Sequence, residues 1–457
     1  MRLSVAARPH RSLPLALLGV GMTVVLIELF LAHRFFGFLT GDDVEVLEEA
    51  FRRAIGFPFS PWDIRSLFVP DFLVAPAVWV ASKLGVSDTR LLIESATLPF
   101  IALTALTIWL VYRLALSWTA DSTAAIAAAF LFGLHWIPLG FGSTVYPRTL
   151  ATACVVAAAL LATRYPFAAG AIAGLAFADR FSEIVFLVPI LSRTDGEGSA
   201  VHLRRGSLAA LGTLVSIIVT VGLYDWITWG APFRSVLQFA HLTLVEPDFA
   251  SRVKYQSPFW YAVNIARWCA PTLLPLFVIG RKATRWSFVL VPLVALSVVR
   301  HKELRYLQAI IPFLMIAAAA GFAILWRRRR SIAIALLIVS LLWDLHGLRY
   351  FAHKSMPAVM AARALAADPR VHTVVVSQLW AYGDQLYFQH RIGTRDVGTP
   401  PRDLGPALVG ADAAALYESD LDDATLRATL ARNGFAPWRT FRDGPARAVV
   451  VFRPPRL

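Results

Sequence analysis

The chain has 457 residues, of which 57% are hydrophobic and only 16% are charged. A soluble domain carries about a quarter charged residues, so this composition excludes an ordinary soluble protein. Apolar runs of about twenty residues recur along the chain, and each is long enough to cross a bilayer as a helix. The sequence therefore predicts an α-helical polytopic membrane protein.

The formal net charge of +14 would suggest nucleic-acid binding in a soluble protein. Here the Lys and Arg residues gather in short segments between apolar runs, a pattern that places basic loops in the cytoplasm. The main clusters are RRGS (204–207), GRKATR (280–285) and WRRRRS (326–331). We therefore expect membrane lipid, and no nucleic acid, among the partners.

Cys154 and Cys269 lie inside apolar runs far apart in sequence, so we expect no disulfide or metal framework.

Taken in chain order, the apolar runs predict about eleven spans. Arg2, Arg8 and Arg11 place the N-terminus in the cytoplasm. The side of 141–148 depends on whether the second run truly crosses. The runs lie near 13–34, 66–83, 89–116, 122–140, 147–163, 168–192 (interrupted by ADRFSE, 178–183), 207–228, 258–280, 286–300, 305–326 and 331–349.

Counting spans from a cytoplasmic N-terminus puts three polar segments on the outer face. They are the loop at 35–65, the loop at 229–257 and the HKELR junction at 301–305. The same count leaves the three basic clusters inside, in agreement with the rule that basic loops stay in the cytoplasm. Within the sixth run, GAIAG (170–174) is a small-xxx-small pattern that favours close helix packing.

Beyond residue 350 the composition changes to β-branched runs alternating with amphipathic stretches. We expect strands at 371–378, 413–419 and 446–454, and helices at 357–368 and 421–434. We therefore expect two domains, a transmembrane domain at 1–350 and a small C-terminal α/β domain at 351–457, which the span count places on the outer face.

The first outer loop begins with an acidic pair, Asp42 and Asp43, followed by Glu45, Glu48 and Glu49 on a short predicted helix. One interpretation is a solvated helix whose acidic residues favour its N-terminus. The loop continues, however, into PWDIRS, which brings Trp62, Asp63 and Arg65 to the membrane surface. Ionic and aromatic groups beside an acidic pair favour a binding or catalytic site.

The HKELR junction contains His301, Lys302, Glu303 and Arg305 between two apolar runs. These cations could extend towards lipid headgroups. The span count places them on the outer face, where positive charge is scarce, and a cationic cluster there suits a phosphate carried on a lipid. Both interpretations stay open on the sequence.

Three further polar residues interrupt apolar surroundings. Arg148 and Arg180 lie near or within spans, where charge is a functional hypothesis by default and a buried ion pair is the alternative. Asp225 closes the seventh span, and the aromatic segment after it favours an interfacial helix.

These motifs together resemble the membrane-embedded GT-C glycosyltransferases, in particular the Alg9/Alg12/PIG-B-type mannosyltransferases. The specific pieces are the HKELRY run with Pro312 after it, and the acidic pair followed by Ile64-Arg65-Ser66. Weaker matches are YDWITWGAPFRSVLQF, YQSPFWY and DRFS. The resemblance covers 15–350 and leaves the tail outside it. The matching positions of the first loop are Asp42, Asp43, Glu49, Trp62, Ile64, Arg65, Ser66 and Phe68–Pro70.

The chain also departs from the family pattern. The family has Asp-Glu where this chain has Asp42 and Asp43, and STVYPRTL lacks the Asn of the usual Arg-x-x-x-Asn segment. The second departure concerns the specificity for sugar or acceptor.

The resemblance implies a GT-C fold and an inverting transfer of a hexose, typically mannose. The donor would be a polyprenyl-phosphate sugar, and the acceptor a lipid-linked glycan or glycolipid. Such a transfer needs a carboxylate base and cations for the departing phosphate. Asp42 is the expected base, with Asp43 beside it, and His301, Lys302 and Arg305 are the expected phosphate ligands. The expected supporting residues are Glu49, Trp62, Arg65, Arg180, Asp225 and Glu303.

We expect no cofactor and a reaction that is independent of metal, although an acidic pair can bind a divalent ion. The alternatives are a transporter or flippase of a charged lipid or solute, and a GT-C enzyme that uses another sugar or a protein acceptor. We see no inverted repeat, which counts against the transporter. Short loops favour the inner membrane of a bacterium, with the site on the periplasmic face, over the endoplasmic reticulum.

Overall fold

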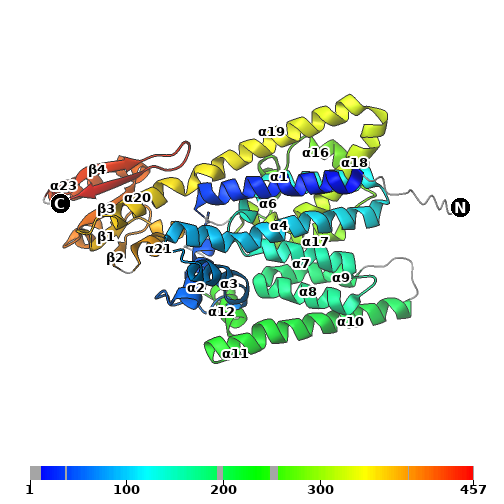
Figure 1. Cartoon of the computed structure of the whole chain (residues 1–457), viewed down its shortest axis with the longest axis horizontal. Coiled ribbons are helices and arrows are strands. Elements are labelled where there is room, and N and C mark those ends of the chain that lie inside the picture. Colours follow the sequence, from blue (N-terminus) through cyan, green and yellow to red (C-terminus); the bar gives the residue numbers. More distant parts are fainter. Residues whose placement is uncertain (1–11, 37–38, 193–198, 247–255, 390, 456–457) are drawn as a thin grey trace.

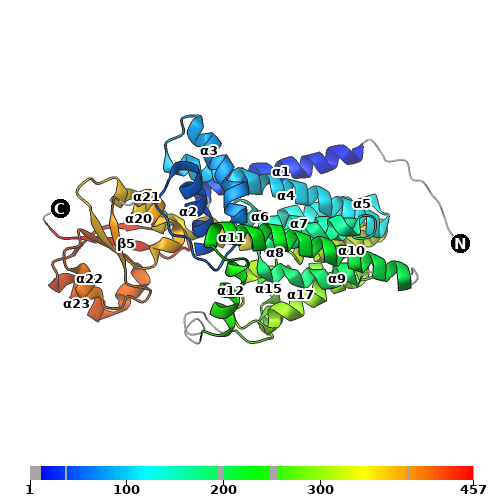
Figure 2. The ribbon, with the colours of Figure 1, turned by 90° about the horizontal axis from the view of Figure 1, so that it is seen from below.

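The computed structural model describes residues 12–36, 39–192, 199–246, 256–389 and 391–455. Its helices form an elongated bundle with a small α/β domain at one end, as Figures 1 and 2 show from two directions. Arg2, Arg8 and Arg11, together with 247–255 of the predicted outer loop at 229–257, lie outside the described residues.

Among the described residues, five helical segments are long and apolar enough to cross a membrane, and a bent pair makes a possible sixth. The bent pair is α5 (Ser122–Leu134) with α6 (Trp136–Gly142), which meet at an angle of 58°. The prediction of a multi-pass helical membrane protein is confirmed. The five segments contain α1 (Ser12–Phe35), α4 (Thr89–Thr119), α10 (Ser199–Ile217) continued by η3 (Ile218–Leu223) and α11 (Tyr224–Trp229), α18 (Ile311–Arg328), and α19 (Arg330–Lys354).

The remaining apolar helices are shorter than the roughly twenty residues that a straight span needs. Gly170 and Gly174 of GAIAG pack against α10, where an added Cβ at Gly170 would lie 1.8 Å from the carbonyl oxygen of Ala209. The predicted helix contact is therefore confirmed. The shorter apolar helices are α7 (Arg148–Leu161), α8 (Pro166–Asp179), η2 (Phe181–Phe186) with α9 (Leu187–Leu191), α14 (Trp260–Val263), α15 (Ile265–Trp268), α16 (Leu273–Gly280) and α17 (Ser287–Val298).

The predicted span at 66–83 is wrong. Its residues form η1 (Pro70–Val74) and α3 (Ala75–Lys83), which follow each other directly but together are shorter than the roughly twenty residues that a crossing needs. The imidazole Nδ1 of His33, near the end of α1, lies 3.0 Å from the carboxylate of Glu94, near the start of α4. The chain therefore leaves α1 and enters α4 at the same end of the bundle.

The predicted span at 168–192 is also wrong as a single crossing. The helix α8 ends before Arg180, whose guanidinium contacts Asp42 of the first loop. The chain then turns back into the bundle, where Phe186 is buried and its ring packs against Phe313 of α18. Figure 1 shows that α9 leads towards the end at which α10 begins. The polar break foreseen at ADRFSE is therefore the tip of a hairpin.

The first loop contains the predicted short helix, α2 (Gly41–Ile55). Asp43 accepts a hydrogen bond from the backbone N–H of Thr40, which satisfies a donor that the helix start would otherwise leave free. The apolar side of α2, which includes Leu47 and Phe51, packs with Val78 of α3 in one core cluster. The helix α12 (Arg234–Leu244) follows α11 and has the amphipathic sequence predicted for an interfacial helix.

The C-terminal α/β domain is present, with a five-stranded sheet in the order β2-β1-β3-β5-β4. The strands predicted at 371–378, 413–419 and 446–454 and both predicted helices are confirmed, whereas β2 and β4 were not predicted. The elements are α20 (Met356–Ala366), β1 (Thr373–Val376), η5 (Leu379–Tyr382), α21 (Asp384–Phe388), β2 (Gly393–Asp396), α22 (Leu404–Leu408), β3 (Ala413–Tyr417), η6 (Glu418–Asp422), α23 (Ala424–Arg432), β4 (Ala436–Phe441) and β5 (Val449–Arg453).

The domain packs on the end of the bundle that holds α2. Val359 and Leu386 share a buried apolar cluster with α2, and an added Cβ at Gly41 would lie 2.5 Å from the ring of Trp380. Arg34, at the end of α1, pairs with Asp443 of the domain at 2.6 Å. The start of α1 and the turn between α18 and α19 lie at the opposite end (Figure 1).

This arrangement predicts the side on which Leu84 is exposed. Leu84→Cys, at a position that is 79% exposed just after α3, will react with a membrane-impermeant maleimide on the same side as Val409→Cys in the C-terminal domain. Arg328→Cys will react only from the other side. Background should be low because Cys154 and Cys269 are buried. If Leu84→Cys instead reacts from the same side as Arg328→Cys, the segment 66–83 crosses the membrane and this arrangement is contradicted.

Candidate active site

One carboxylate at the end of the bundle that carries the C-terminal domain is surrounded by three guanidinium groups. Asp42 contacts Arg65 at 2.5 Å, Arg180 at 2.7 Å and Arg305 at 3.3 Å. Arg65 also pairs with Glu45 at 2.9 Å, one turn further along α2. The structure therefore brings together residues that the sequence analysis found in three separate motifs.

The charges of these arginines determine how Asp42 ionises. Burial alone would raise the pKa of Asp42, but the nearby charges of Arg180, Arg65 and Arg305 outweigh burial and hold that pKa well below its usual range. Asp42 is consequently an anion at any physiological pH. In this state it neutralises the arginines and is a weak base.

Each arginine reaches Asp42 from a different break in regular structure. Arg65 lies in the extended segment between α2 and η1, Arg180 lies where α8 ends, and Arg305 lies in a short 3-10 turn, η4 (Leu304–Leu307). Breaks of this kind are tolerated at membrane depth where the backbone is buried in protein or lines a cavity. The irregular segments between helices thus supply the cations.

Two buried residues of the STVYPRTL segment support the cluster. The ring of Tyr146 lies 5.2 Å from the guanidinium carbon of Arg305 and 5.7 Å from that of Arg180. Arg148 pairs with Glu183, and its guanidinium lies 4.6 Å from the ring of Tyr306. The sequence analysis noted Arg148 as a span cation and did not assign Tyr146 a role, because a single tyrosine beside a span carries no distinctive pattern.

Three residues of the HKELR junction form a chain of contacts that ends at Asp42. His301 Nε2 lies 3.3 Å from Glu303, and Glu303 also pairs with Arg305, which contacts Asp42. Lys302 is placed differently. Its side chain is buried, and its ammonium donates to the carbonyl oxygens of Gln256 and Val299. Lys302 therefore anchors the junction in this state.

Asp43 is fully buried and, among the described residues, forms no ion pair with the arginines that hold Asp42. One of its oxygens accepts hydrogen bonds from the backbone N–H groups of Leu39 and Thr40, at 2.9 and 2.8 Å, and from the hydroxyl of Thr40. The other accepts from the hydroxyl of Thr144 at 3.0 Å. Burial raises the pKa of Asp43, although these hydrogen bonds oppose the rise. Within the acidic pair, Asp42 therefore contacts the arginines, whereas Asp43 stabilises the local structure.

Two other predicted supporting residues lie outside the cluster. Glu49, about two turns along α2 from Asp42, pairs with Arg52 at 2.5 Å and with Arg53 at 3.3 Å. Asp225 is buried and accepts from the backbone N–H and hydroxyl of Ser235, which fixes the turn between α11 and α12. Both hold the loops that surround the cluster.

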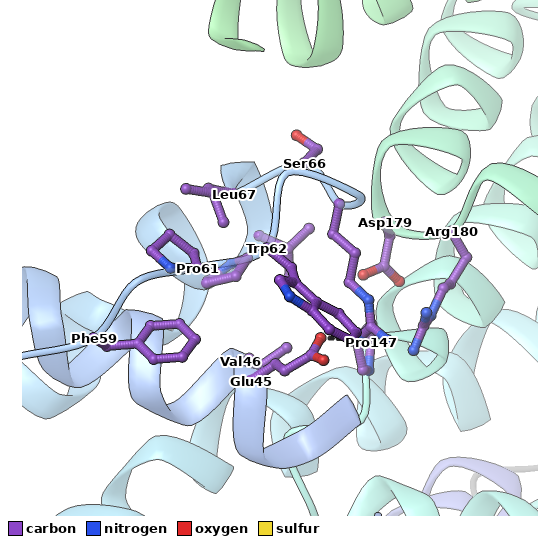
Figure 3. Close-up of a pocket in the computed structure, with 13 residues that line it drawn as sticks. Glu45, Val46, Phe59, Pro61, Trp62, Ser66, Leu67, Pro147, Asp179 and Arg180 are labelled. Carbon is purple, nitrogen blue, oxygen red and sulfur yellow. Dashed lines mark ion pairs between the residues drawn. The ribbon is translucent and has the colours of Figure 1, made fainter. Parts of the chain in front are cut away.

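A small pocket opens beside Asp42 and the arginines. Glu45, Trp62, Arg65, Asp179 and Arg180 line it, and its volume is about 40 Å³, enough for a few water molecules. Figure 3 shows Glu45, Asp179 and Arg180 converging near Pro147, with Trp62 beside them. Trp62 is 62% exposed at this pocket, so it presents an aromatic face to an incoming molecule. In the described part of the chain, no group of three or more His, Cys, Asp or Glu residues is arranged to hold a metal ion.

Comparison with known proteins establishes the family. The model of the Alg9-like mannosyltransferase family matches residues 57–378. The chain belongs to this family. No curated protein matches it. The match includes Trp62, Arg65, Arg180 and the HKELR junction, whereas Asp42 lies before its start.

Solved structures with the same fold are GT-C glycosyltransferases. ArnT from Cupriavidus metallidurans in the apo state has a TM-score of 0.61 and 16% identity, over 96% of this chain and 97% of that one. The same protein bound to undecaprenyl phosphate has a TM-score of 0.59 and 15% identity, over the same shares. The mycobacterial arabinofuranosyltransferase AftD has a TM-score of 0.52 and 14% identity, over 99% of this chain and 40% of that one. These TM-scores establish the GT-C fold, as predicted.

The two neighbouring acids should respond differently to substitution. Asp43→Ala will lower the free energy of unfolding by about 2–4 kcal/mol, because it leaves several buried donors without an acceptor. Thermal denaturation in detergent measures the change. Asp63→Ala is the control, since Asp63 only forms a surface ion pair with Arg234 at 2.8 Å, worth about 0–1 kcal/mol. Equal shifts for the two variants would contradict the structural role of Asp43.

Proposed function

We propose that this glycosyltransferase moves a hexose, mannose in the first instance, from a polyprenyl-phosphate donor to a hydroxyl of a lipid-linked glycan or glycolipid. The observation that carries the proposal is the carboxylate of Asp42 held among the guanidinium groups of Arg65, Arg180 and Arg305. Such a cluster offers a base and an anion site within a few ångströms of each other. An inverting transfer from a phosphate leaving group needs this combination.

In the proposed reaction, Asp42 accepts the proton of the acceptor hydroxyl as its oxygen attacks the anomeric carbon of the hexose. The bond between that carbon and the phosphate oxygen breaks, and its electron pair stays on the phosphate. Arg305 and Arg180 stabilise the negative charge that develops there. His301 and Glu303 orient Arg305 through the contacts described above. The products are the lengthened glycan and the polyprenyl phosphate.

We further propose that the donor phosphate displaces Asp42 from its arginines. While three cations hold Asp42, its low pKa makes it a poor proton acceptor. A phosphate that pairs with the guanidinium groups would withdraw their charge from Asp42, and the pKa of Asp42 would rise towards its usual range. The base would thus be activated only when the donor is bound, which limits reaction of an empty site.

The small pocket supports a change of shape on binding. A hexose is much larger than a few water molecules, so a volume of about 40 Å³ cannot admit it. The segment that includes Phe59, Trp62 and Leu67 lines the pocket and lacks regular helix or strand. We propose that this segment moves outward to admit the sugar. Trp62 would then lie against the sugar ring, and Arg65 would move together with the donor.

For the topology, we propose eleven crossings with the site on the outer, periplasmic face of a bacterial inner membrane. The hairpin at Arg180 adds one crossing and the loss of 66–83 removes one, so the total is unchanged. This count keeps all three basic clusters inside and puts 141–148, α2 and the C-terminal domain outside. Such a placement matches the end of the bundle at which Asp42 lies.

The experiment that tests the function uses membranes that contain the wild-type chain, Asp42→Asn or Asp63→Asn. They are incubated with radiolabelled polyprenyl-phosphate-mannose and a total lipid extract. Wild type and Asp63→Asn should form a labelled glycolipid, whereas Asp42→Asn should lose at least about 100-fold in rate, because the amide cannot accept the proton. Equal transfer by Asp42→Asn would reject Asp42 as the base. Absence of transfer from mannosyl, glucosyl and galactosyl donors would reject a hexosyl donor.

The pH dependence of kcat/KM should follow the charges around Asp42. Because its pKa lies well below the usual range, titration of Asp42 in the free enzyme should not lower kcat/KM down to about pH 5. Arg180→Met removes one cation and raises that pKa, so the acid limb should move to higher pH. Arg164→Met, an exposed arginine between α7 and α8, is the control. An acid limb that stays in place in Arg180→Met would contradict this electrostatic account.

A further inference from the structure

A cation that lies outside the family motifs belongs to the same cluster. Lys354 is the last residue of α19, at the junction of the bundle with the C-terminal domain. Its ammonium is close enough to Arg305, Glu303 and Asp43 for their charges to act on it. It therefore lies within electrostatic reach of the site.

A series of ring contacts connects Lys354 to the cluster. Its ammonium lies 6.0 Å from the ring centre of Phe351, which packs against Phe141 at 5.7 Å. Phe141 packs against Tyr146 at 4.7 Å, and the guanidinium of Arg305 lies 5.2 Å from the ring of Tyr146. These aromatic residues form one wall, and Lys354 and Arg305 both contact it.

The charges of the two cations act on each other, and no carboxylate is dedicated to Lys354 among the described residues. Arg305 is matched by Glu303 and Asp42, whereas Lys354 forms no ion pair or hydrogen bond within the described residues. Bringing two like charges together in a partly buried place costs free energy that a bound anion would offset. The pair is therefore suited to a bound anion with more than one negative charge.

The end of α19 is fixed from both sides, so the position of Lys354 is defined. Ser355, the next residue, donates its hydroxyl to the carbonyl oxygen of Phe35 at 3.1 Å. His353 lies 3.0 Å from Asp443 of the C-terminal domain, and Asp443 also pairs with Arg34. The C-terminal domain thus helps to hold Lys354 at the site.

We propose that Lys354 is a phosphate-binding residue of the donor site and that it pairs with the leaving phosphate together with Arg305. This inference rests on the proposed function. A polyprenyl-phosphate sugar is a phosphodiester with one negative charge, and loss of the sugar leaves a phosphate monoester that gains a second charge. Lys354 supplies a cation for that second charge, so it stabilises the product phosphate more than the donor.

The test is direct binding of undecaprenyl phosphate to the purified full-length protein, with undecaprenol as the ligand that lacks phosphate. Lys354→Met should weaken binding of undecaprenyl phosphate at least about tenfold, as expected for the loss of one charge-assisted contact. Lys354→Arg should bind within about threefold of wild type. Lys83→Met is the matched control, because Lys83 is exposed at the end of α3, away from the site. Undecaprenol binding should be equal in all four proteins.

The outcomes separate this inference from the proposed function. Suppose that wild type binds undecaprenyl phosphate more tightly than undecaprenol. If Lys354→Met then binds undecaprenyl phosphate with the same affinity as wild type, the role of Lys354 is rejected and the donor class stands. If wild type shows no preference for the phosphate, the donor class itself is rejected. If Lys354→Met and Lys354→Arg lose binding equally and both denature at lower temperature, Lys354 serves packing and the inference is overturned.

Discussion

The site depends on a balance of charge in which one carboxylate holds three guanidinium groups together. Arg65, Arg180 and Arg305 are mutually repulsive, and without an anion between them they would separate or draw in water. Asp42 provides that anion in the structure described here. Any molecule that takes over these arginines must itself be an anion, and for a protein of this family the natural candidate is the phosphate of a lipid-linked donor.

Much of the surrounding architecture keeps Asp42 in position. Asp43 fixes the start of α2 through buried hydrogen bonds, and Trp380 of the C-terminal domain covers Gly41 at the same helix start. Glu49 and its arginines hold the far turns of α2. The carboxylate therefore projects from a helix that is fixed on several sides, while Arg65 lies on an irregular segment, which in our proposal moves when the sugar binds. Such an arrangement keeps the proposed base, Asp42, in place while the segment that includes Arg65 opens the pocket.

The local patterns of the sequence predicted most of the site and the outline of the fold. Asp42, Arg65, Arg180 and Arg305 were identified because polar residues beside apolar runs stand out, and the hydrophobic period and β-branched runs located most helices and three of five strands. The span at 66–83 failed because hydropathy alone cannot distinguish a short helix that packs at the end of the bundle from one that crosses. The hairpin at 168–192 was misread for a related reason, since only tertiary contacts show in which direction the chain leaves Arg180.

Other features depend on contacts between distant segments. Tyr146 packs against Phe141 of α6, and Lys354 is the last residue of α19. Neither has a local pattern that distinguishes it from an ordinary boundary residue. The different environments of Asp42 and Asp43 are equally inaccessible to sequence reasoning, because adjacent residues on a helix point about 100° apart. Thr144, 101 residues away in the chain, donates a hydrogen bond to Asp43 that no local pattern reveals.

A structure of the full-length protein with undecaprenyl phosphate bound would test the central claim most directly. The account predicts the phosphate within hydrogen-bonding distance of Arg305 and Arg180, with Lys354 beside it and with Asp42 released from at least two of its three arginines. A phosphate bound elsewhere, with Asp42 still paired to Arg65, Arg180 and Arg305, would contradict the account.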